Sequence, residues 1–265
     1  MDSILSRFDS ISLDEMSGIR LMNRTDTKFV TSAQMLRKML EMASKEYLVQ
    51  EIGGRRNMLY YTVYFDTPDY TFYNTHHNGH CNRQKVRLRS YVESHLSFLE
   101  VKTKDNHGRT RKKRVGVDAP ASGLRTMSLD CGEDFLAAQL RVDPHSLSQK
   151  IENRFNRITL VNKARTERLT IDTQLEFNNL DTGRRLSLGK TAIIELKRDG
   201  LQPSPILAIL HALHIKPCGF SKYCIGEALT NPDLKHNRLK PRIRKIKKTT
   251  GETLTLQQPG LTTLI

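Results

Sequence analysis

The chain has 265 residues, enough for one large domain or two small ones, and no stretch resembling a linker divides it. Its net charge of +15 at pH 7 favours polyanionic partners such as phosphates, nucleic acid or an anionic membrane surface. No apolar run approaches the roughly 20 residues that span a bilayer, and the 4 cysteines form no CxxC pair, so we expect a soluble, cytoplasmic protein with neither disulfides nor a zinc ribbon.

The first third of the chain alternates between helical and extended patterns. A weak helical pattern near the N-terminus precedes a strand over residues 23–32. Ser32 then has the position of an N-cap for a helix that reaches about Tyr47, because apolar residues recur there at helical spacing. An aromatic and β-branched strand over residues 59–65 and a turn of helix over residues 70–75 complete this part.

The most strongly charged strands lie between residues 84 and 117. In two adjacent strands the charged residues alternate with apolar ones, which is typical of a strand with one charged face. The charged positions are Lys85, Arg87, Arg89, Glu100, Lys102 and Lys104. Neighbouring cations ~5–6 Å apart repel by ~3 kcal/mol at an effective dielectric of ~20, so this face needs an anion or bulk water. A third basic strand is expected over residues 109–117.

The second half predicts further strands separated by short helices. The expected strands are residues 153–161, 168–177 and 191–197, and the expected helices lie within 120–143, after Pro144, in 206–214 and from 220 onwards. About eight antiparallel strands with helices between them predict an α+β fold, and that number of strands can close into a barrel.

The class of function depends on whether the charged faces of the strands point into a barrel or out to solvent. If helices pack outside on the apolar faces, the strands form a closed β-barrel whose interior is a charged tunnel. A condensed phosphate chain would relieve the repulsion among its cations, and the interleaved carboxylates can hold a divalent metal that bridges phosphate oxygens. The alternative is that the charged faces are solvated surfaces of open sheets.

Eight segments spread over nearly the whole chain carry these charges in a characteristic order. They are RTDTKFV (24–30), YFDTPDY (64–70), VRLRSY (86–91), LEVKTK (99–104), the segment around Arg157, RLTIDTQLEF (168–177), IIELK (193–197) and FSKYCIGEAL (220–229). Together they resemble the catalytic domain of the vacuolar transporter chaperone (VTC) polyphosphate polymerases, within the triphosphate tunnel metalloenzyme superfamily that includes the CYTH domains.

The resemblance implies a set of site residues. Six cations match positions that line the tunnel and bind the triphosphate and the growing chain: Lys28, Arg87, Arg89, Lys102, Arg157 and Arg168. Four further positions are expected to bind phosphate: Lys104, Lys197, Ser221 and Lys222. The carboxylate that binds the metal, Mn²⁺ or Mg²⁺, matches Glu195, and Glu100 and Asp172 are expected in the same acidic set.

Several of these assignments have a structural alternative. Arg168 and Lys104 can be solvated strand residues, Ser221 can be a helix N-cap, and Asp172 can serve only to orient an arginine. Glu195 is a firmer assignment, because a carboxylate inside the apolar run IIEL needs a partner to be tolerated.

Two segments bear on the number and kind of metal ions. Tunnel enzymes of the CYTH type begin with the pattern ExExK, whereas this chain has Arg24, Asp26 and Lys28, which weakens a two-metal interpretation and favours the polymerase branch. The segment HHNGHC, residues 76–81, resembles a metal cluster, but its spacing matches no zinc site well.

The activity implied by the resemblance is transfer of the terminal phosphoryl group of ATP to the end of an inorganic polyphosphate chain. Arg87 and Arg89 would clamp phosphate oxygens from a face without packing, so their loss is expected to stop turnover and leave the fold intact. With water as acceptor the same site is a triphosphatase, which is the alternative. A non-enzymatic polyanion or nucleic-acid binder ranks third, because Tyr91 is nearly the only aromatic residue of the basic strands.

The last part of the chain is set apart by its charge. Residues 235–248 hold eight Lys or Arg and no acid, with Pro241 in the middle. We therefore expect residues 1–234 to form the tunnel domain and residues 235–265 to be a flexible or loosely attached tail. Such a tail is expected to gather polyanion, either the exiting polyphosphate chain or an anionic membrane surface.

Overall fold

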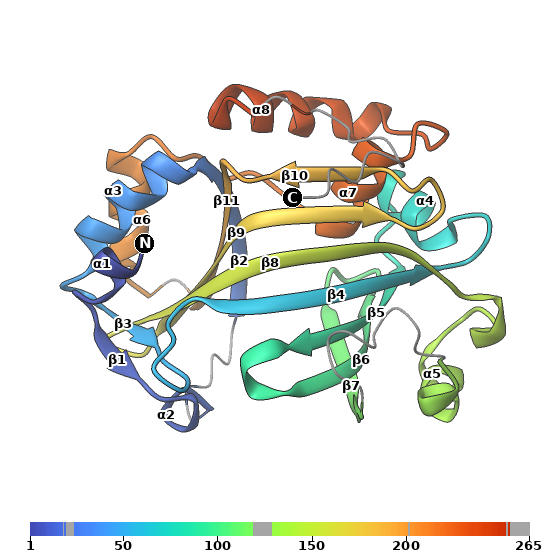
Figure 1. The fold of residues 1–265 in the computed structure, drawn as a ribbon, viewed down its shortest axis with the longest axis horizontal. Helices are drawn as coiled ribbons and strands as arrows, with labels where there is room; N and C mark the ends of the chain where they lie inside the picture. Colours follow the sequence, from blue (N-terminus) through green and yellow to red (C-terminus); the bar gives the residue numbers. More distant parts are fainter. Residues whose placement is uncertain (18, 20–23, 119–128, 201, 253, 255–265) are drawn as a thin grey trace, which may run out of the picture.

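One large sheet carries most of the chain that the computed structural model describes, which is residues 1–17, 19, 24–118, 129–200, 202–252 and 254 (Figure 1). Its strands are β1 (Asp9–Ile11), β2 (Arg24–Ser32), β3 (Tyr47–Gln50), β4 (Met58–Asp66), β5 (Arg83–Tyr91), β6 (Leu96–Lys104), β7 (Thr110–Val117), β8 (Ser148–Asn162), β9 (Glu167–Asn179), β10 (Arg185–Leu188) and β11 (Thr191–Asp199). The main path runs β2-β11-β9-β8-β4-β5-β6-β7, while β10 pairs with β9 and β3 links β8 to β1. Only the β1–β3 pair is parallel among the described strands.

Short helices connect the strands and cover them. They are α1 (Asp2–Leu5), α2 (Leu13–Ser17), α3 (Ala33–Ala43), α4 (Thr71–His77), α5 (Glu133–Gln139), α6 (Pro205–Ala212), α7 (Lys222–Thr230) and α8 (Lys240–Thr250). Figure 1 shows α1, α3 and α6 gathered at one end of the sheet and α8 lying across the other side, above β10. Within the described ranges, no helix combines the length and the apolar character needed to cross a bilayer.

The predicted α+β class with a large antiparallel sheet is confirmed, but hydrogen bonds do not close the sheet. Strands β2 and β7 stand at the two ends of the main path, and they do not pair with each other in the described chain. The predicted closed barrel is therefore not confirmed. The sheet is nevertheless long and twisted, as expected for many neighbouring antiparallel strands.

Most predicted elements are present, with differences at their ends. Met35 N donates to the Ser32 hydroxyl at 3.2 Å, which confirms the predicted N-cap of α3. That helix stops at Ala43 instead of Tyr47, because the chain enters β3 there. After Pro144 only a 3₁₀ turn forms, and β8 begins at Ser148, earlier than predicted.

The outer faces of the sheet pack against helices, as expected. Phe29, Leu169 and Ile194 pack with α1, α3 and α6 in one buried cluster. Leu88 and Leu99 pack with α5 in another. Along these strands the apolar residues of both clusters alternate with charged residues. The charged side chains therefore point to the opposite face of the sheet.

Helices α7 and α8 cover part of the opposite face. Val30 and Ile193, which share a face with the charged side chains of β2 and β11, are buried in one cluster with residues of α7 and α8. The approach of α7 is close, because a Cβ added at Gly226 would lie 2.6 Å from the ring of Phe177. This face of the sheet therefore has an apolar part and a charged part. Helices α7 and α8 pack on the apolar part.

A bulge in β9, at Gln174 and Leu175, sets which residues share this face. The register between β8 and β9 shifts by one residue between Arg154 and Asn156. Below the shift, Arg157 stands directly opposite Asp172. Because side chains alternate along a strand, the extra residue in β9 turns Asp172 to the same face as Leu175 and Phe177.

The basic C-terminal segment differs from the expectation of a flexible tail. Residues 240–250 form helix α8, in which Ile243 and Ile246 are buried against the sheet and α7. Leu239, just before the helix, is buried in the same cluster. These apolar residues recur at spacings of four and three, a narrow helical stripe that the count of charges conceals. The division of domains after residue 234 stays a prediction.

We predict that Ile246→Ala lowers the free energy of unfolding by about 2–4 kcal/mol, because it removes a fully buried side chain from the cluster under α8. Arg244→Ala, at an exposed position of the same helix, should change it by less than about 0.5 kcal/mol. Urea unfolding followed by circular dichroism measures both. Equal unfolding midpoints for the two variants would show that α8 does not dock.

Candidate functional site

Each carboxylate of the predicted metal set lies opposite a predicted tunnel cation on a neighbouring strand. The cross-strand pairs are Lys28 with Glu195 between β2 and β11, Arg157 with Asp172 between β8 and β9, and Arg87 with Glu100 between β5 and β6. Directly opposite residues share a face, with Cβ atoms ~4.5–5.5 Å apart. The strand register alone therefore places an acid beside a base at three points of the charged face.

Asp172 is held by two cations near the centre of the sheet. Arg157 donates from Nε to Oδ1 at 2.5 Å and from Nη2 to Oδ2 at 2.8 Å, and Lys222 pairs with Oδ2. Burial opposes ionisation, but the two cations outweigh it and hold the pKa of Asp172 well below its usual range. Burial lowers the pKa of Lys222 to about 7, against the pull of Asp172. Asp172 thus orients an arginine, as the structural alternative predicted.

Glu100 has a similar arrangement between β5 and β7. Arg87 reaches its Oε2 from Nε and Nη2 at 2.6 Å each, and Lys112 reaches its Oε1 at 2.8 Å. The Glu100 side chain is only 1% exposed, yet Arg87, Arg89 and Lys112 overcome the effect of burial and keep its pKa low. The expectation that Arg87 gains no packing is wrong, because Arg87 neutralises a buried carboxylate.

Glu195 is the most accessible of the three carboxylates. Its contacts are longer, 3.8 Å to Lys28 and 3.3 Å to Lys197, and its side chain is 20% exposed. Burial would raise the pKa of Glu195, but Lys28, Lys197 and Arg157 hold it below the usual range. Glu195 is therefore ionised and retains surface for a further ligand.

The carboxylates do not form one metal-binding group. The described residues contain no cluster of three or more His, Cys, Asp or Glu placed to hold a metal ion. The oxygens of Glu100 and Asp172 are taken up by short ion pairs, so these two residues do not fit the predicted acidic set. Glu195 fits a Mg²⁺ or Mn²⁺ ion of the kind that one or two carboxylates hold together with substrate phosphates.

Two further predicted cations lie near these pairs without a carboxylate of their own in the described chain. Arg89 is buried, donates from Nε to the Thr62 hydroxyl at 3.4 Å and lies over the Tyr60 ring. Lys102 is exposed, although protein surrounds it closely enough to lower its pKa to about 8, with Lys28 adding to the shift.

The start of α7 brings a second layer of groups to the charged face. Ser221 caps the helix by accepting from Cys224 N at 3.3 Å, and its hydroxyl also accepts from Lys85 Nζ at 2.7 Å. Lys28 Nζ donates to the backbone oxygen of Phe220 at 3.2 Å. The N-cap interpretation of Ser221 is confirmed, and its role in binding phosphate stays a prediction. Lys85 was missing from the predicted set, although it shares the face of Arg87 by simple alternation.

The remaining predicted positions differ in their distance from the cluster. Arg168 stands opposite Lys197 in the register between β9 and β11, and both residues are partly buried. Burial lowers the pKa of Lys197, against the pull of Glu195 and with the help of Arg157 and Arg168. Lys104 ends β6, opposite Arg83, away from the three ion pairs. The roles of these residues in binding phosphate stay predictions.

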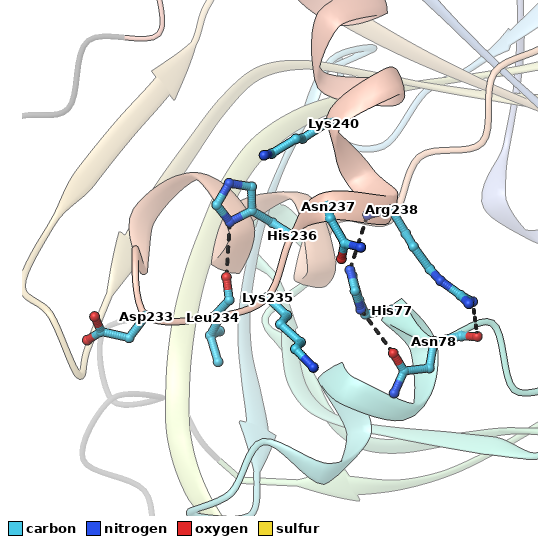
Figure 2. Close-up of a pocket in the computed structure, with 9 residues that line it drawn as sticks. All are labelled: His77, Asn78, Asp233, Leu234, Lys235, His236, Asn237, Arg238 and Lys240. Carbon is cyan, nitrogen blue, oxygen red and sulfur yellow. Dashed lines mark hydrogen bonds between the residues drawn. The ribbon is translucent and has the colours of Figure 1, made fainter.

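A pocket of about 470 Å³ lies apart from the three ion pairs of the charged face, between the end of α4 and the start of α8 (Figure 2). Its lining includes His77, Lys235, Arg238 and Lys240. Arg238 N donates to His77 Nε2 at 3.3 Å, so this ring nitrogen is an acceptor. In Figure 2 the side chains of Lys235 and Lys240 point in different directions, so the pocket is basic but its cations do not converge.

The comparisons with known proteins found one family model and several solved structures similar to this chain. A family model described as the VTC domain matches residues 23–231. A putative adenylate cyclase from Bacillus halodurans is similar in structure, with a TM-score of 0.48 and 14% identity over 76% of this chain and 96% of that chain. A Hippeastrum protein described as a putative adenylyl cyclase with a dominant triphosphatase activity gives 0.49 and 14% over 78% and 96%. No curated protein matches the sequence significantly.

We predict opposite effects on stability for two neighbouring arginines. Arg87→Ala should cost about 3 kcal/mol of unfolding free energy, because it leaves Glu100 buried with one partner fewer. Arg89→Met should leave stability unchanged or raise it, since it removes a buried cation that other cations repel. Arg111→Ala, at an exposed position of β7, is the control for arginine removal. Urea unfolding checks all three, and an unaltered midpoint for Arg87→Ala would mean that the ion pair contributes nothing.

We also predict that tripolyphosphate binding depends on pH through Lys102. Its lowered pKa of about 8 means that the free protein loses this charge as the pH rises through 8, and affinity for an anion should fall there. Lys102→Arg stays charged over this range, so it should bind more tightly than the wild type at pH 9 and nearly equally at pH 7. Titration calorimetry at both pH values measures the affinity of each protein for tripolyphosphate. The ligand titrates in the same way for both proteins, so its titration cancels when they are compared at one pH. Parallel pH profiles would remove Lys102 from the site.

Proposed function

The chain belongs to the VTC domain family, and from this premise we propose that it is a polyphosphate polymerase, which transfers the terminal phosphoryl group of ATP to the end of an inorganic polyphosphate chain. The observation that carries the proposal is the excess of cations over carboxylates on one face of the sheet. Three acids are shared among Lys28, Lys112, Lys197, Lys222 and two arginines, while Lys85, Arg89 and Lys102 add charge without an acid of their own in the described chain. Such a face suits a ligand with many closely spaced negative charges.

The paired arginines retain donors for phosphate. A guanidinium has five N–H groups in a fixed fork, and Arg157 uses only Nε and Nη2 for Asp172. Arg87 likewise uses Nε and Nη2 for Glu100. The carboxylates hold both planes in place, so the remaining N–H groups can donate to phosphate oxygens with little loss of side-chain entropy.

The lysines would supply charge along the chain of phosphates. Lys28, Lys85 and Lys102 are near one another, as burial together with their mutual repulsion lowers the pKa of Lys85 and Lys102. An ammonium group is a point charge on a flexible stem, so each lysine can follow a phosphate as the polymer shifts. Neutralising the equatorial oxygens and aligning donor with acceptor is most of what phosphoryl transfer asks of a protein.

The closed barrel of the family is part of this proposal. In such a barrel the charged face, with α7 packed against it, would surround the polymer and limit the entry of water. A terminal phosphate of the polymer then becomes the acceptor in place of water. Glu195 would hold a divalent ion, which would supply positive charge against the phosphate oxygens.

The test is turnover of ATP by the purified full chain in the presence of Mn²⁺, with ADP release and chain length on a gel as readouts. We predict growing chains together with ADP, and a loss of about 100-fold or more in Glu195→Gln. Glu176→Gln, an exposed acid on β9, is the matched control and should retain full activity. Titration of Mn²⁺ by electron paramagnetic resonance should show weaker binding in Glu195→Gln and not in Glu176→Gln.

The products decide among the activities that this site can support. Free phosphate without chains would make the protein a triphosphatase. No turnover, combined with tight binding of polyphosphate, would make it a binding protein. Full activity of Glu195→Gln with an unchanged Mn²⁺ requirement would remove Glu195 from the metal site.

A further inference from the structure

Arg242 brings α8 to the charged face, although α8 lies outside the residues that match the VTC domain. Its guanidinium lies over the backbone of Gly219, where an added Cβ would be 3.8 Å from the guanidinium carbon. The next two residues, Phe220 and Ser221, accept hydrogen bonds from Lys28 and Lys85. Cations from β2, β5 and α8 therefore flank the same short segment before α7.

The part of the charged face beside Gly219 differs from the rest, because its cations do not pair with carboxylates in the described chain. In the described ranges of the chain, none of Arg83, Lys85 and Arg242 forms an ion pair with a carboxylate. Arg83 donates to the backbone oxygen of His80 at 2.6 Å, and Lys85 donates to the Ser221 hydroxyl. Neutral acceptors leave the positive charge uncompensated, so the repulsion must be relieved by solvent or by an anion.

His76 of α4 provides an independent sign of a missing ligand. Its Nδ1 is buried and has no hydrogen-bond partner among the described residues. Burial, together with Lys85, Arg83, Arg242 and Lys28, lowers the pKa of this imidazole to about 2, so the ring is neutral. A buried polar atom without a partner costs free energy, and in the tautomer with its proton on Nδ1 this ring can recover that free energy by donating to a phosphate oxygen.

We propose that Lys85, Arg83, His76 and Arg242 form an outer phosphate-binding subsite, which holds the polyphosphate chain beyond the phosphates bound near Glu195 and Arg157. The inference rests on the proposed polymerase function and assigns a direction to the polymer. The reacting end lies where carboxylates are present, and the distal chain lies where they are absent. Helix α8 thus contributes to the polymer path of this chain.

A polyphosphate chain suits this subsite better than the other polyanions. The neighbouring rings of Tyr64, Tyr73 and Tyr223 are buried, so they offer no surface on which nucleic-acid bases could stack. A bilayer would meet the outer side of α8, whereas Arg242 turns toward Gly219. The pocket in Figure 2 is lined by residues that precede Arg242 in the chain. Its lysines point in different directions, so it suits a phosphate chain less well than the segment beside Gly219 does.

The test compares binding of long-chain inorganic polyphosphate and of tripolyphosphate to the full chain. Arg242→Ala should weaken binding of the long polymer about tenfold and reduce the slope of log K against log salt by about one unit, because one phosphate contact is lost. Tripolyphosphate affinity should change less than about twofold, because it occupies the inner site. Arg244→Ala, at another exposed arginine on a different face of α8, is the matched control and should leave both affinities within about twofold.

The outcomes separate this inference from the proposed function. If the wild type makes or binds long polyphosphate and Arg242→Ala behaves like Arg244→Ala, the outer subsite is wrong and the polymerase proposal stands. If Arg242→Ala weakens tripolyphosphate as much as the polymer, Arg242 belongs to the inner site and the assigned direction is wrong. A wild type that releases phosphate from ATP but binds no polymer overturns both. Displacement of the polymer by phosphatidylserine vesicles from the wild type, and not from Arg242→Ala, would assign Arg242 to a membrane surface instead.

Discussion

Repulsion among cations that share one face of a sheet is the constraint on which this structure depends. The cross-strand register relieves it at three points by placing a carboxylate directly opposite an arginine or lysine. Two of these carboxylates are buried and doubly paired, so they stabilise the fold and fix the arginine planes. The acids therefore serve first to make a cationic surface compatible with folding.

The same face also has to bury apolar surface. Val30 and Ile193 lie on the strands that carry Lys28 and Glu195, and α7 and α8 pack over them. That packing places Ser221 and Lys222 at the border between the apolar and the charged parts. The core and the site are thus built from one set of strands, and the helix that covers the core also supplies groups to the site.

Local patterns predicted much of this arrangement. Alternation along β5, β6 and β11 identified the faces of Arg87, Glu100 and Glu195, because period two is a property of each strand alone. Contacts between segments that are distant in the chain produce no periodic pattern in the sequence. The pairing of Lys222 with Asp172 and the approach of Arg242 to Gly219 were therefore not predicted. The tail was misjudged because its eight charges outweigh three well-spaced apolar residues in any average over composition.

The three cross-strand ion pairs differ in the length of chain that each must close. Arg87 and Glu100 are 13 residues apart, and Arg157 and Asp172 are 15 apart, so each pair belongs to neighbouring strands joined by a short connection. Lys28 and Glu195 lie on strands that are neighbours in the sheet but far apart in the sequence, and a loop roughly tenfold longer costs about 2 kcal/mol more entropy to close. Each arginine can therefore meet its counter-charge early in folding, before the like charges of the whole face are brought together. The pair that is most costly to assemble is also the one with the loosest contacts, and it contains the carboxylate that remains open to a metal ion.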